Sequence, residues 1–495
     1  MRHKTKKTKN RIKGLYIAFI VAIAVVGALL AVAIWLYFDK NGSLPLVRTE
    51  IMYVIAALAL LLPVLLVLLL IYVIMNRRRG GRTINIVTSN PVKISGAQNE
   101  SCSAEAGSSA QPVKSAGAQP ATAEKPAATA VRASGGVSRF DGLSRIDRER
   151  AKYVREGYDE HITLRTLCER FRNFSAGKLR LYYSISDIRR FISGLLVSHI
   201  MILQGMSGTG KTSLAYAFGE FLDNPSTVVP VQPMWKERTD LIGYYNEFTK
   251  RFNETDLLKK MYEAGYSKDI YITVLDEMNI ARVEYYFAEF LSLLELPDPD
   301  ERELTVVSDK WDTDPVQLRG GHILLPENMW FIGTANNDDS TFAISDKVYD
   351  RAMIMDLDSK AEIFAAEESE KLHITAKRFC ELGEEAQREY EITRRNLKRL
   401  EKMDEFMKAN FRITFGNRIM KQIKAYVPVY IACGGDELEA LDDILSKKVM
   451  RKLGMQNPVY IRNQADRFCQ YMDELFGEDR MKQCKAVVQR LKLSA

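Results

Sequence analysis

The chain of 495 residues is long enough for roughly two to four domains. Its 46% hydrophobic and 27% charged residues are typical of globular proteins and exclude fibrous, collagen-like and wholly disordered classes. The formal charge is +7, yet residues 1–82 carry thirteen lysines and arginines against two acidic residues, a net charge of +11. The other 413 residues therefore sum to −4, which argues against a general nucleic-acid-coating role.

Two long apolar stretches lie near the N-terminus. Residues 14–38 and 51–75 each form a run of 25 residues without a charged side chain. At about 1.5 Å per residue, either run crosses a hydrocarbon core of about 30 Å as a helix. A cleaved signal peptide is the alternative for the first run, but the run is too long and no small-residue cleavage pattern precedes Asp39. The sequence therefore predicts a two-helix transmembrane hairpin within residues 1–82.

Basic residues flank the outer ends of this hairpin. Seven lysines and arginines precede the first run and four arginines follow the second, whereas the connector 39–50 has no net charge. The positive-inside rule then predicts a two-span membrane protein with both termini in the cytoplasm. Anionic lipid headgroups are expected partners of the basic flanks.

A change of composition follows the hairpin. Residues 83–138 are rich in Ser, Ala, Gly, Pro and Gln and poor in large apolar side chains. Such a segment cannot bury enough surface to offset the entropy of ordering, so we expect a disordered tether. Residues 139–198 are expected to form a helical lead-in to the next domain.

From Ile200 onward, short apolar runs alternate with helical patterns, which is typical of a parallel α/β sheet. The first run, residues 200–204, leads into a complete GxxxxGK[ST] phosphate loop followed by a helical segment, the context that this motif requires. We expect nucleotide to be bound by Gly205, Ser207, Gly208, Thr209, Gly210, Lys211, Thr212 and Ser213.

The residue types in this loop suit phosphate chemistry. Glycines let backbone N–H groups approach phosphate oxygens at a helix N-terminus, where the helix dipole favours anions. Lys211 is expected to reach the β- and γ-phosphates, and the Thr212 hydroxyl is expected to ligate Mg²⁺.

Two more predicted strands end in polar residues. Residues 270–275 lead into Asp276, which would hold Mg²⁺ through its water shell, and Glu277, which would polarise the attacking water. Residues 329–334 lead into Asn336. This asparagine either contacts the γ-phosphate or the catalytic water, or it caps the next segment, and spacing alone leaves both interpretations open.

These elements belong to a larger pattern made up of QGMSGTGKTSL, VQPMWKERTDLIGYYN, VLDEMNIARVEYYFAEFLSLLE, LPENMWFIGTANNDDS and ISDKVYDRA. The pattern resembles that of AAA+ ATPases, in the McrB-like and dynein-related branch that neighbours the MoxR group. The resemblance runs from about residue 182 to residue 357. It implies an α/β P-loop core over residues 199–358, a parallel sheet flanked by helices, with a helical lid and C-terminal helices over residues 359–495.

The resemblance also implies roles for single residues. Asn336 falls at the sensor-1 position, and Arg351 falls where the family places an arginine finger that acts on a neighbouring subunit's nucleotide. Arg418 resembles a sensor-2 arginine at the start of a lid helix, and the resemblance implies that this arginine binds nucleotide. McrB-type motors carry an MNxxD signature; here Ala335 replaces the Met while Asn336 and Asp339 keep the N-x-x-D spacing. This departure weakens the inference of the GTP preference of McrB-type motors, so ATP is the expected nucleotide and GTP is the less expected one.

One further segment matches the family. The residues around Trp235, Asp240, Leu241 and Gly243 correspond to its inserted region after the second strand, which often faces the pore of the ring or a partner.

Three functions fit the sequence. The favoured one is a membrane-anchored cytoplasmic AAA+ ATPase that uses ATP and Mg²⁺ to remodel an unidentified protein client. A trans-acting arginine needs a neighbour, so the chain is expected to form a ring with itself, by family example a hexamer. The second is the motor subunit of a restriction or defence system, linked to nucleic acid only through a separate nuclease. The third is a nucleotide-gated membrane scaffold with little turnover, which the presence of Lys211, Asp276, Glu277 and Arg351 disfavours.

Overall fold

The structure is a computed structural model of the chain that describes residues 138–336, 341–358 and 361–494. The predicted transmembrane hairpin and almost all of the tether lie outside these residues. Within the described ranges, no helix is both long enough and apolar enough to cross a membrane.

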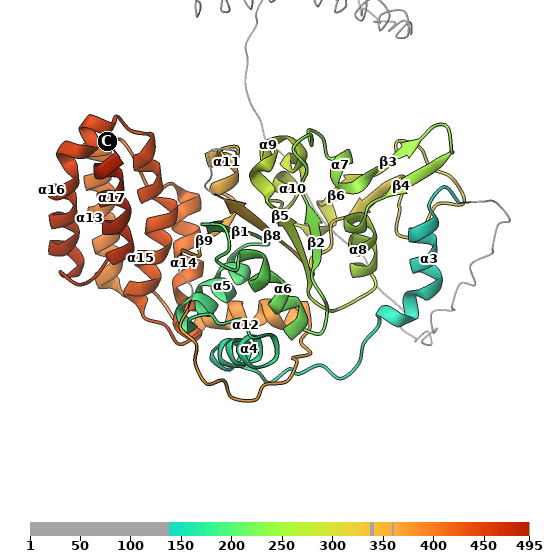
Figure 1. Cartoon of the computed structure of the whole chain (residues 1–495), viewed down its shortest axis with the longest axis horizontal. Helices are drawn as coiled ribbons and strands as arrows, with labels where there is room; N and C mark the ends of the chain where they lie inside the picture. The colour runs from blue at the N-terminus through green and yellow to red at the C-terminus, as the bar shows by residue number, and fades with distance from the viewer. Residues whose placement is uncertain (1–137, 337–340, 359–360, 495) are drawn as a thin grey trace, which may run out of the picture. The chain divides into compact units, whose positions relative to one another are not determined.

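A five-stranded parallel sheet forms the centre of the core, in the order β2-β5-β8-β1-β9 (Figure 1). Its strands are β1 (Ile200–Gly205), β2 (Thr227–Pro230), β5 (Tyr271–Asp276), β8 (Met329–Asn336) and β9 (Met353–Asp356). The predicted strands at 200–204, 270–275 and 329–334 are confirmed as β1, β5 and β8. Because all pairs are parallel, the carboxyl ends of the strands lie at one edge of the sheet.

Helices cover both faces of the sheet, which explains why the strands are almost continuously apolar. In β1, Ile200 and Ile202 face one layer of helices, while Met201 and Leu203 face the other. The first layer consists of α3 (Asp141–Glu149), α7 (Thr239–Ile242), α8 (Asp256–Ala264), α9 (Val283–Tyr286) and α10 (Ala288–Leu293). The second consists of α4 (Leu164–Leu179), α5 (Ile185–Val197), α6 (Lys211–Phe221) and α12 (Ala376–Glu389).

Short elements connect these layers. Two hairpins pair β3 (Gly243–Asn246) with β4 (Arg251–Glu254) and β6 (Glu303–Thr305) with β7 (His322–Leu324). The first hairpin lies in the segment that the sequence likens to the family's inserted region. The remaining short helices of the core are η1 (Arg150–Tyr153), η2 (Met278–Ile280), η3 (Pro299–Glu301) and α11 (Asp346–Tyr349).

The predicted lead-in, residues 139–198, is divided between the two faces of the sheet. Helix α3 lies beside α8 and β4, whereas α4 and α5 pack with α6 and α12 (Figure 1). Arg139, just before α3, is buried and forms ion pairs with Asp314 at 2.8 Å and Asp309 at 3.0 Å. Its guanidinium also lies 4.5 Å from the centre of the Trp311 ring. These contacts attach α3 to the segment between β6 and β7.

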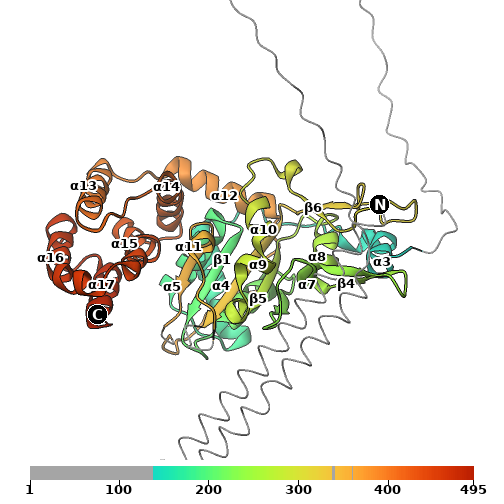
Figure 2. The same cartoon turned by 90° about the horizontal axis from the view of Figure 1, so that it is seen from above.

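The helices after residue 359 also form two groups. Helix α12 packs its apolar face, which includes Phe379, against Trp330 in β8 and Phe218 in α6, so it belongs to the core. The helical lid begins only at α13 and has its own apolar centre (Figure 2). It contains α13 (Arg394–Phe411), α14 (Asn417–Ala432), α15 (Glu437–Lys448), η4 (Met450–Met455), α16 (Pro458–Phe476) and α17 (Lys482–Ser494). Gly477, at φ +107°, separates α16 from α17.

Candidate nucleotide-binding site

The phosphate loop joins the carboxyl end of β1 to the N-terminus of α6. Gly205, Gly208 and Gly210 have φ angles of +141°, +78° and +93°, which side chains with a Cβ rarely adopt. At Gly205 a Cβ would also lie 2.5 Å from the carbonyl oxygen of Leu357. Glycine is therefore required here for the loop conformation and for its close approach to Leu357, and α6 begins immediately after the loop at Lys211. This is the geometry of an anion site at a helix N-terminus.

The other predicted loop residues are in the expected places. Ser207 is exposed at the tip, the Thr209 hydroxyl donates to the carbonyl of Met206 at 3.0 Å, and Ser213 lies in the first turn of α6. The Lys211 ammonium is buried and donates to the carbonyl oxygens of Gly205, at 3.0 Å, and Met206, at 2.7 Å. The loop therefore holds a positive charge inside its curve.

A tyrosine that the sequence did not single out supports this loop. The Tyr183 hydroxyl, just before α5, donates to the carbonyl oxygen of Gly210 at 3.1 Å. The side chain is buried, and this burial raises the pKa of its phenol, so the hydroxyl remains a donor at neutral pH. No motif marks Tyr183, because it comes from a segment that precedes the phosphate loop in the chain.

Asp276 lies at the centre of the polar contacts beside the loop. Its Oδ1 atom accepts from the Thr212 hydroxyl at 2.7 Å and from the Thr334 hydroxyl at 2.9 Å. The Thr334 oxygen in turn accepts from the backbone N–H of Glu277 at 2.9 Å. Thr334 was missed in the sequence, although the Gly-Thr pair before Asn336 at a strand end marks its place.

The donors at this point suit a magnesium ion. Mg²⁺ prefers oxygen ligands and keeps several waters, and the Thr212 hydroxyl and Asp276 carboxylate supply oxygens that already lie within hydrogen-bond distance of each other. In the part of the chain that the structure describes, no group of three or more His, Cys, Asp and Glu side chains could hold a metal ion. Because Mg²⁺ usually keeps several water ligands, water and nucleotide oxygens would complete its coordination at this site.

Glu277 follows Asp276 in an unusual backbone conformation. Its φ angle is +52°, which is uncommon for a residue with a Cβ, and its side chain is exposed. Gly333 makes this turn fit, since a Cβ there would lie 1.9 Å from the Sδ atom of Met278. Strained backbone of this kind concentrates at functional sites, where the surrounding structure enforces it.

Asn336 lies directly beside the phosphate loop. It is paired with Gly205 in the register of β8 and β1. The buried Asn279 donates its side-chain amide to the Asn336 carbonyl at 2.8 Å and so holds this strand end. Asp339, the other member of the N-x-x-D spacing, lies outside the described residues. The structure thus brings Lys211, Asp276 and Asn336 to one edge of the sheet.

Arg351 lies at the opposite edge. It immediately precedes β9, and its carbonyl accepts from the Ser198 hydroxyl at 3.2 Å, just before β1 begins. The phosphate loop follows the other end of β1. Since β1 has 6 residues, about 20 Å of strand separates the two positions. Arg351 therefore cannot reach a nucleotide that is bound to the phosphate loop of its own chain.

Arg418 lies with Arg351 and not with the phosphate loop. It is in the first turn of α14, as predicted, and its guanidinium is 2.8 Å from Oε1 of Glu295. The other carboxylate oxygen of Glu295 is 2.7 Å from Nε of Arg351, an ion pair without the alignment of a hydrogen bond. Both arginines line a surface cavity of about 1010 Å³. Glu295 has no sequence signal beyond its place at the end of a helical motif.

Comparisons with known proteins give a family match and weak structural likenesses. Residues 200–352 match the family described as AAA domain (dynein-related subfamily). No curated protein matches the sequence. Among solved structures, a candidate ATPase from Cytophaga hutchinsonii is similar at 12% identity, covering 61% of this chain and 87% of that one, with a TM-score of 0.38. A full-length MCM homolog from Methanopyrus kandleri is similar at 13% identity, covering 57% and 59%, with a TM-score of 0.31.

The two structural likenesses are too weak to bear on function, so the family match and the site geometry decide the assignment. A glycine-rich loop with a buried lysine, a threonine–aspartate pair and a strained glutamate lie within the matched residues. Residues 200–352 form an AAA domain of the dynein-related subfamily, and the protein is a P-loop ATPase.

Proposed function

We propose that this protein is a membrane-anchored cytoplasmic AAA+ ATPase that hydrolyses ATP with Mg²⁺ in a ring of identical subunits and uses the energy to remodel a protein client. Lys211 and the loop glycines bind the phosphates, and Thr212 and Asp276 hold the metal. Glu277 orients and polarises the attacking water, and Asn336 contacts the γ-phosphate or that water. Magnesium, when bound, neutralises charge that develops on the phosphate oxygens.

The main support for a ring is the distance between Arg351 and the phosphate loop of the same chain. An arginine that stabilises the transition state must lie at the γ-phosphate, yet Arg351 is at the far edge of the sheet. Glu295 holds it there together with Arg418, beside an open cavity. A second subunit that presents its phosphate loop to this cavity would bring the two halves of the site together.

A mixing experiment tests the ring. Glu277→Gln and Arg351→Ala chains should each be nearly inactive. The first lacks the carboxylate that polarises the attacking water, and the second lacks a trans arginine worth about 10³–10⁵-fold in turnover. Mixed assemblies should recover part of the activity, since some interfaces pair an intact Glu277 with an intact Arg351 from the neighbour. Steady-state ATP hydrolysis across mixing ratios measures the recovery. Absence of recovery in mixtures that are shown to co-assemble would remove the role of Arg351 and the argument for a ring.

The membrane anchor is a proposal from the sequence alone. The two apolar runs at 14–38 and 51–75 and their basic flanks support two spans with both termini and the ATPase domain in the cytoplasm. Attraction of the flanks to anionic lipid supports the same orientation.

A further inference from the structure

Two consecutive lysines at the end of α15 are buried against the core. Lys447 and Lys448 have only 8% and 2% of their surface exposed. Lysine is almost never fully buried unless its amine has partners, so both side chains must be held by specific contacts. These contacts lead from the lid to the two ends of β9.

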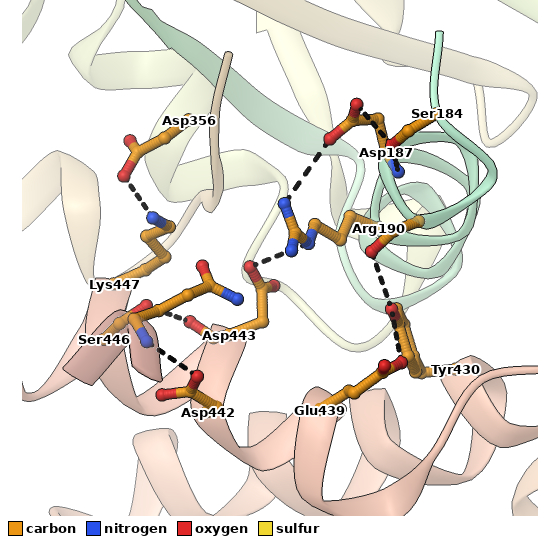
Figure 3. A network of polar contacts seen from close by, with 12 residues as sticks. Ser184, Asp187, Arg190, Asp356, Tyr430, Glu439, Asp442, Asp443, Ser446 and Lys447 are labelled. Atoms are coloured by element: carbon orange, nitrogen blue, oxygen red, sulfur yellow. Dashed lines mark hydrogen bonds and ion pairs between the residues drawn. The ribbon is translucent and has the colours of Figure 1, made fainter. Parts of the chain in front are cut away.

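Lys447 connects the lid, through Asp356 of β9, to Gln204 of β1, the strand that leads into the phosphate loop. Its ammonium forms an ion pair with the carboxylate of Asp356, at the carboxyl end of β9 (Figure 3). The other oxygen of Asp356 accepts from the side-chain amide of Gln204 at 2.7 Å. Gln204 is the residue immediately before Gly205, the first glycine of the phosphate loop. Its carbonyl also accepts from the N–H of Leu357 at 2.8 Å.

Lys448 connects the lid to the turn that carries Arg351. Its amine donates to the carbonyl oxygen of Tyr349 at 2.7 Å and to that of Ala352. These two carbonyls lie on either side of Arg351 in the chain. The backbone that presents Arg351 to the surface is therefore held from inside by a lid residue.

The two lysine contacts form one closed path. The Tyr349 hydroxyl donates to the Oε1 atom of Gln204 at 3.0 Å, so the side chain of Gln204 touches both the Arg351 turn and Asp356. Lys447 and Lys448 are neighbours on a rigid helix, and a small shift of α15 must therefore displace both contacts together.

The same helix is tied to the core at a third point. Asp443 of α15 is buried and accepts from the Tyr426 hydroxyl at 2.7 Å. It also lies 3.4 Å from Nε of Arg190 in α5 (Figure 3). A partial loss of these contacts would leave buried charges unpaired, which is costly, so α15 is expected to move as a unit against β9.

We propose that Lys447 and Lys448 are positioning residues that couple a subunit's own phosphate loop to the placement of its Arg351. A change in the loop reaches Gln204 through the backbone, passes to Asp356 and Lys447, and returns through Lys448 to the turn on either side of Arg351. Each subunit thereby offers its arginine to the neighbour according to the state of its own nucleotide site. This inference rests on the proposed trans role of Arg351.

Mixed assemblies provide a test that separates positioning from folding. A Glu277→Gln chain can only supply Arg351 and is the donor; an Arg351→Ala chain can only hydrolyse and is the acceptor. Lys448→Met in the donor should lower the recovered activity roughly two- to thirtyfold, the range expected for a coupling residue. The same change in the acceptor should leave it unaltered, because that chain has no Arg351 to position. Equal losses in both placements would overturn the proposal.

The path to the phosphate loop is tested in the donor. Gln204→Leu and Lys447→Met should each lower the recovered activity, and together they should cost no more than the larger single loss, because both interrupt one path. Fully additive losses would overturn the coupling. Lys424→Met, at an exposed position on α14, is the matched control and should have no effect in either chain.

Two further comparisons address a lysine variant that does not fold and a failure of the proposed ring. Where Lys448→Met does not fold, as judged by thermal melting, Lys447→Met removes the ion pair with Asp356 on the same path and should lower the recovered activity in the donor but not in the acceptor. A symmetric or absent effect of Lys447→Met would overturn the proposal. Donor and acceptor chains with both lysines intact are mixed first. If this mixture recovers no activity, the proposed function itself is refuted before the lysines are tested.

Discussion

Thr334 connects the Asp276 carboxylate to the turn at Glu277 through one oxygen atom. Its hydroxyl donates to Asp276 and accepts the backbone N–H of Glu277. No motif of the sequence assigns it a function, but its removal would free both the carboxylate and the strained backbone that follows it.

We therefore predict that Thr334→Val lowers kcat about 10–100-fold, the cost that outer-shell partners of metal ligands usually carry. Nucleotide affinity should change little, since the loop glycines and Lys211 remain intact. Thr334→Ser keeps the hydroxyl and should retain most of the activity. Steady-state kinetics with a separate nucleotide-binding titration check both statements, and an equal loss in the serine variant would show that the hydroxyl is unimportant.

At the scale of single elements, α15 carries a titratable group in an unusual environment. Burial lowers the pKa of the Lys448 amine from 10.5 to about 7; Asp350 opposes this shift, and Arg451, Lys452 and Arg418 add to it. A neutral amine still has two protons for the two carbonyls that it contacts. Its contacts therefore persist above pH 7.

The sign of the effect on stability follows from this shift. Between pH 7 and pH 10.5 the folded chain holds a neutral amine while the unfolded chain keeps the proton, so the Lys448 contribution to stability rises with pH. We predict that the melting temperature of the wild type, relative to that of Lys448→Met, increases as the pH rises from about 7 to 9. Calorimetry of both chains, with Lys424→Met as the control, measures this increase. Parallel pH profiles would contradict it.

A buried arginine just before α3 attaches the start of this helix to the core. Arg139 pairs with Asp314, whose side chain is only 3% exposed, and with Asp309, which is largely exposed. We predict that Arg139→Met destabilises the core by about 3–5 kcal/mol, because it leaves the Asp314 carboxylate buried and unpaired. Thermal melting measures the loss. Arg145→Met, at an exposed position of α3, should have almost no effect, and equal losses in both variants would contradict the prediction.

At the scale of the whole molecule, the proposed hairpin would place the ATPase domain on the cytoplasmic side of a membrane. Cysteines introduced at Gly42 or Ser43, in the connector, should react with an impermeant thiol reagent added to intact cells, whereas Cys102 should not. A protein gel shift after labelling gives the readout, and detergent-opened cells provide the control in which Cys102 reacts. Labelling of Cys102 together with a protected connector would reverse the predicted orientation.

Local patterns of the sequence were sufficient to predict which residues lie at the carboxyl edge of the sheet, beside the phosphate loop. The loop glycines, Lys211, Asp276, Glu277 and Asn336 follow three apolar strands, and parallel strands bring their carboxyl ends together whatever the rest of the chain does. The family resemblance implied a lid helix that begins near Arg418 and a helical C-terminal region, and both are observed.

Contacts between distant segments could be known only from the tertiary structure. Thr334 meets Asp276 across 58 positions of the chain and Lys447 meets Asp356 across 91, and no local pattern encodes such a pairing. The packing of α12 with the core, and the meeting of Arg351 and Arg418 at Glu295, depend on which helix faces find partners. The sequence by itself determined the chemistry of the phosphate site, because that chemistry lies at the ends of a few strands. Only the folded chain decided how lid, arginines and loop are joined, because their contacts arise from packing over the whole domain.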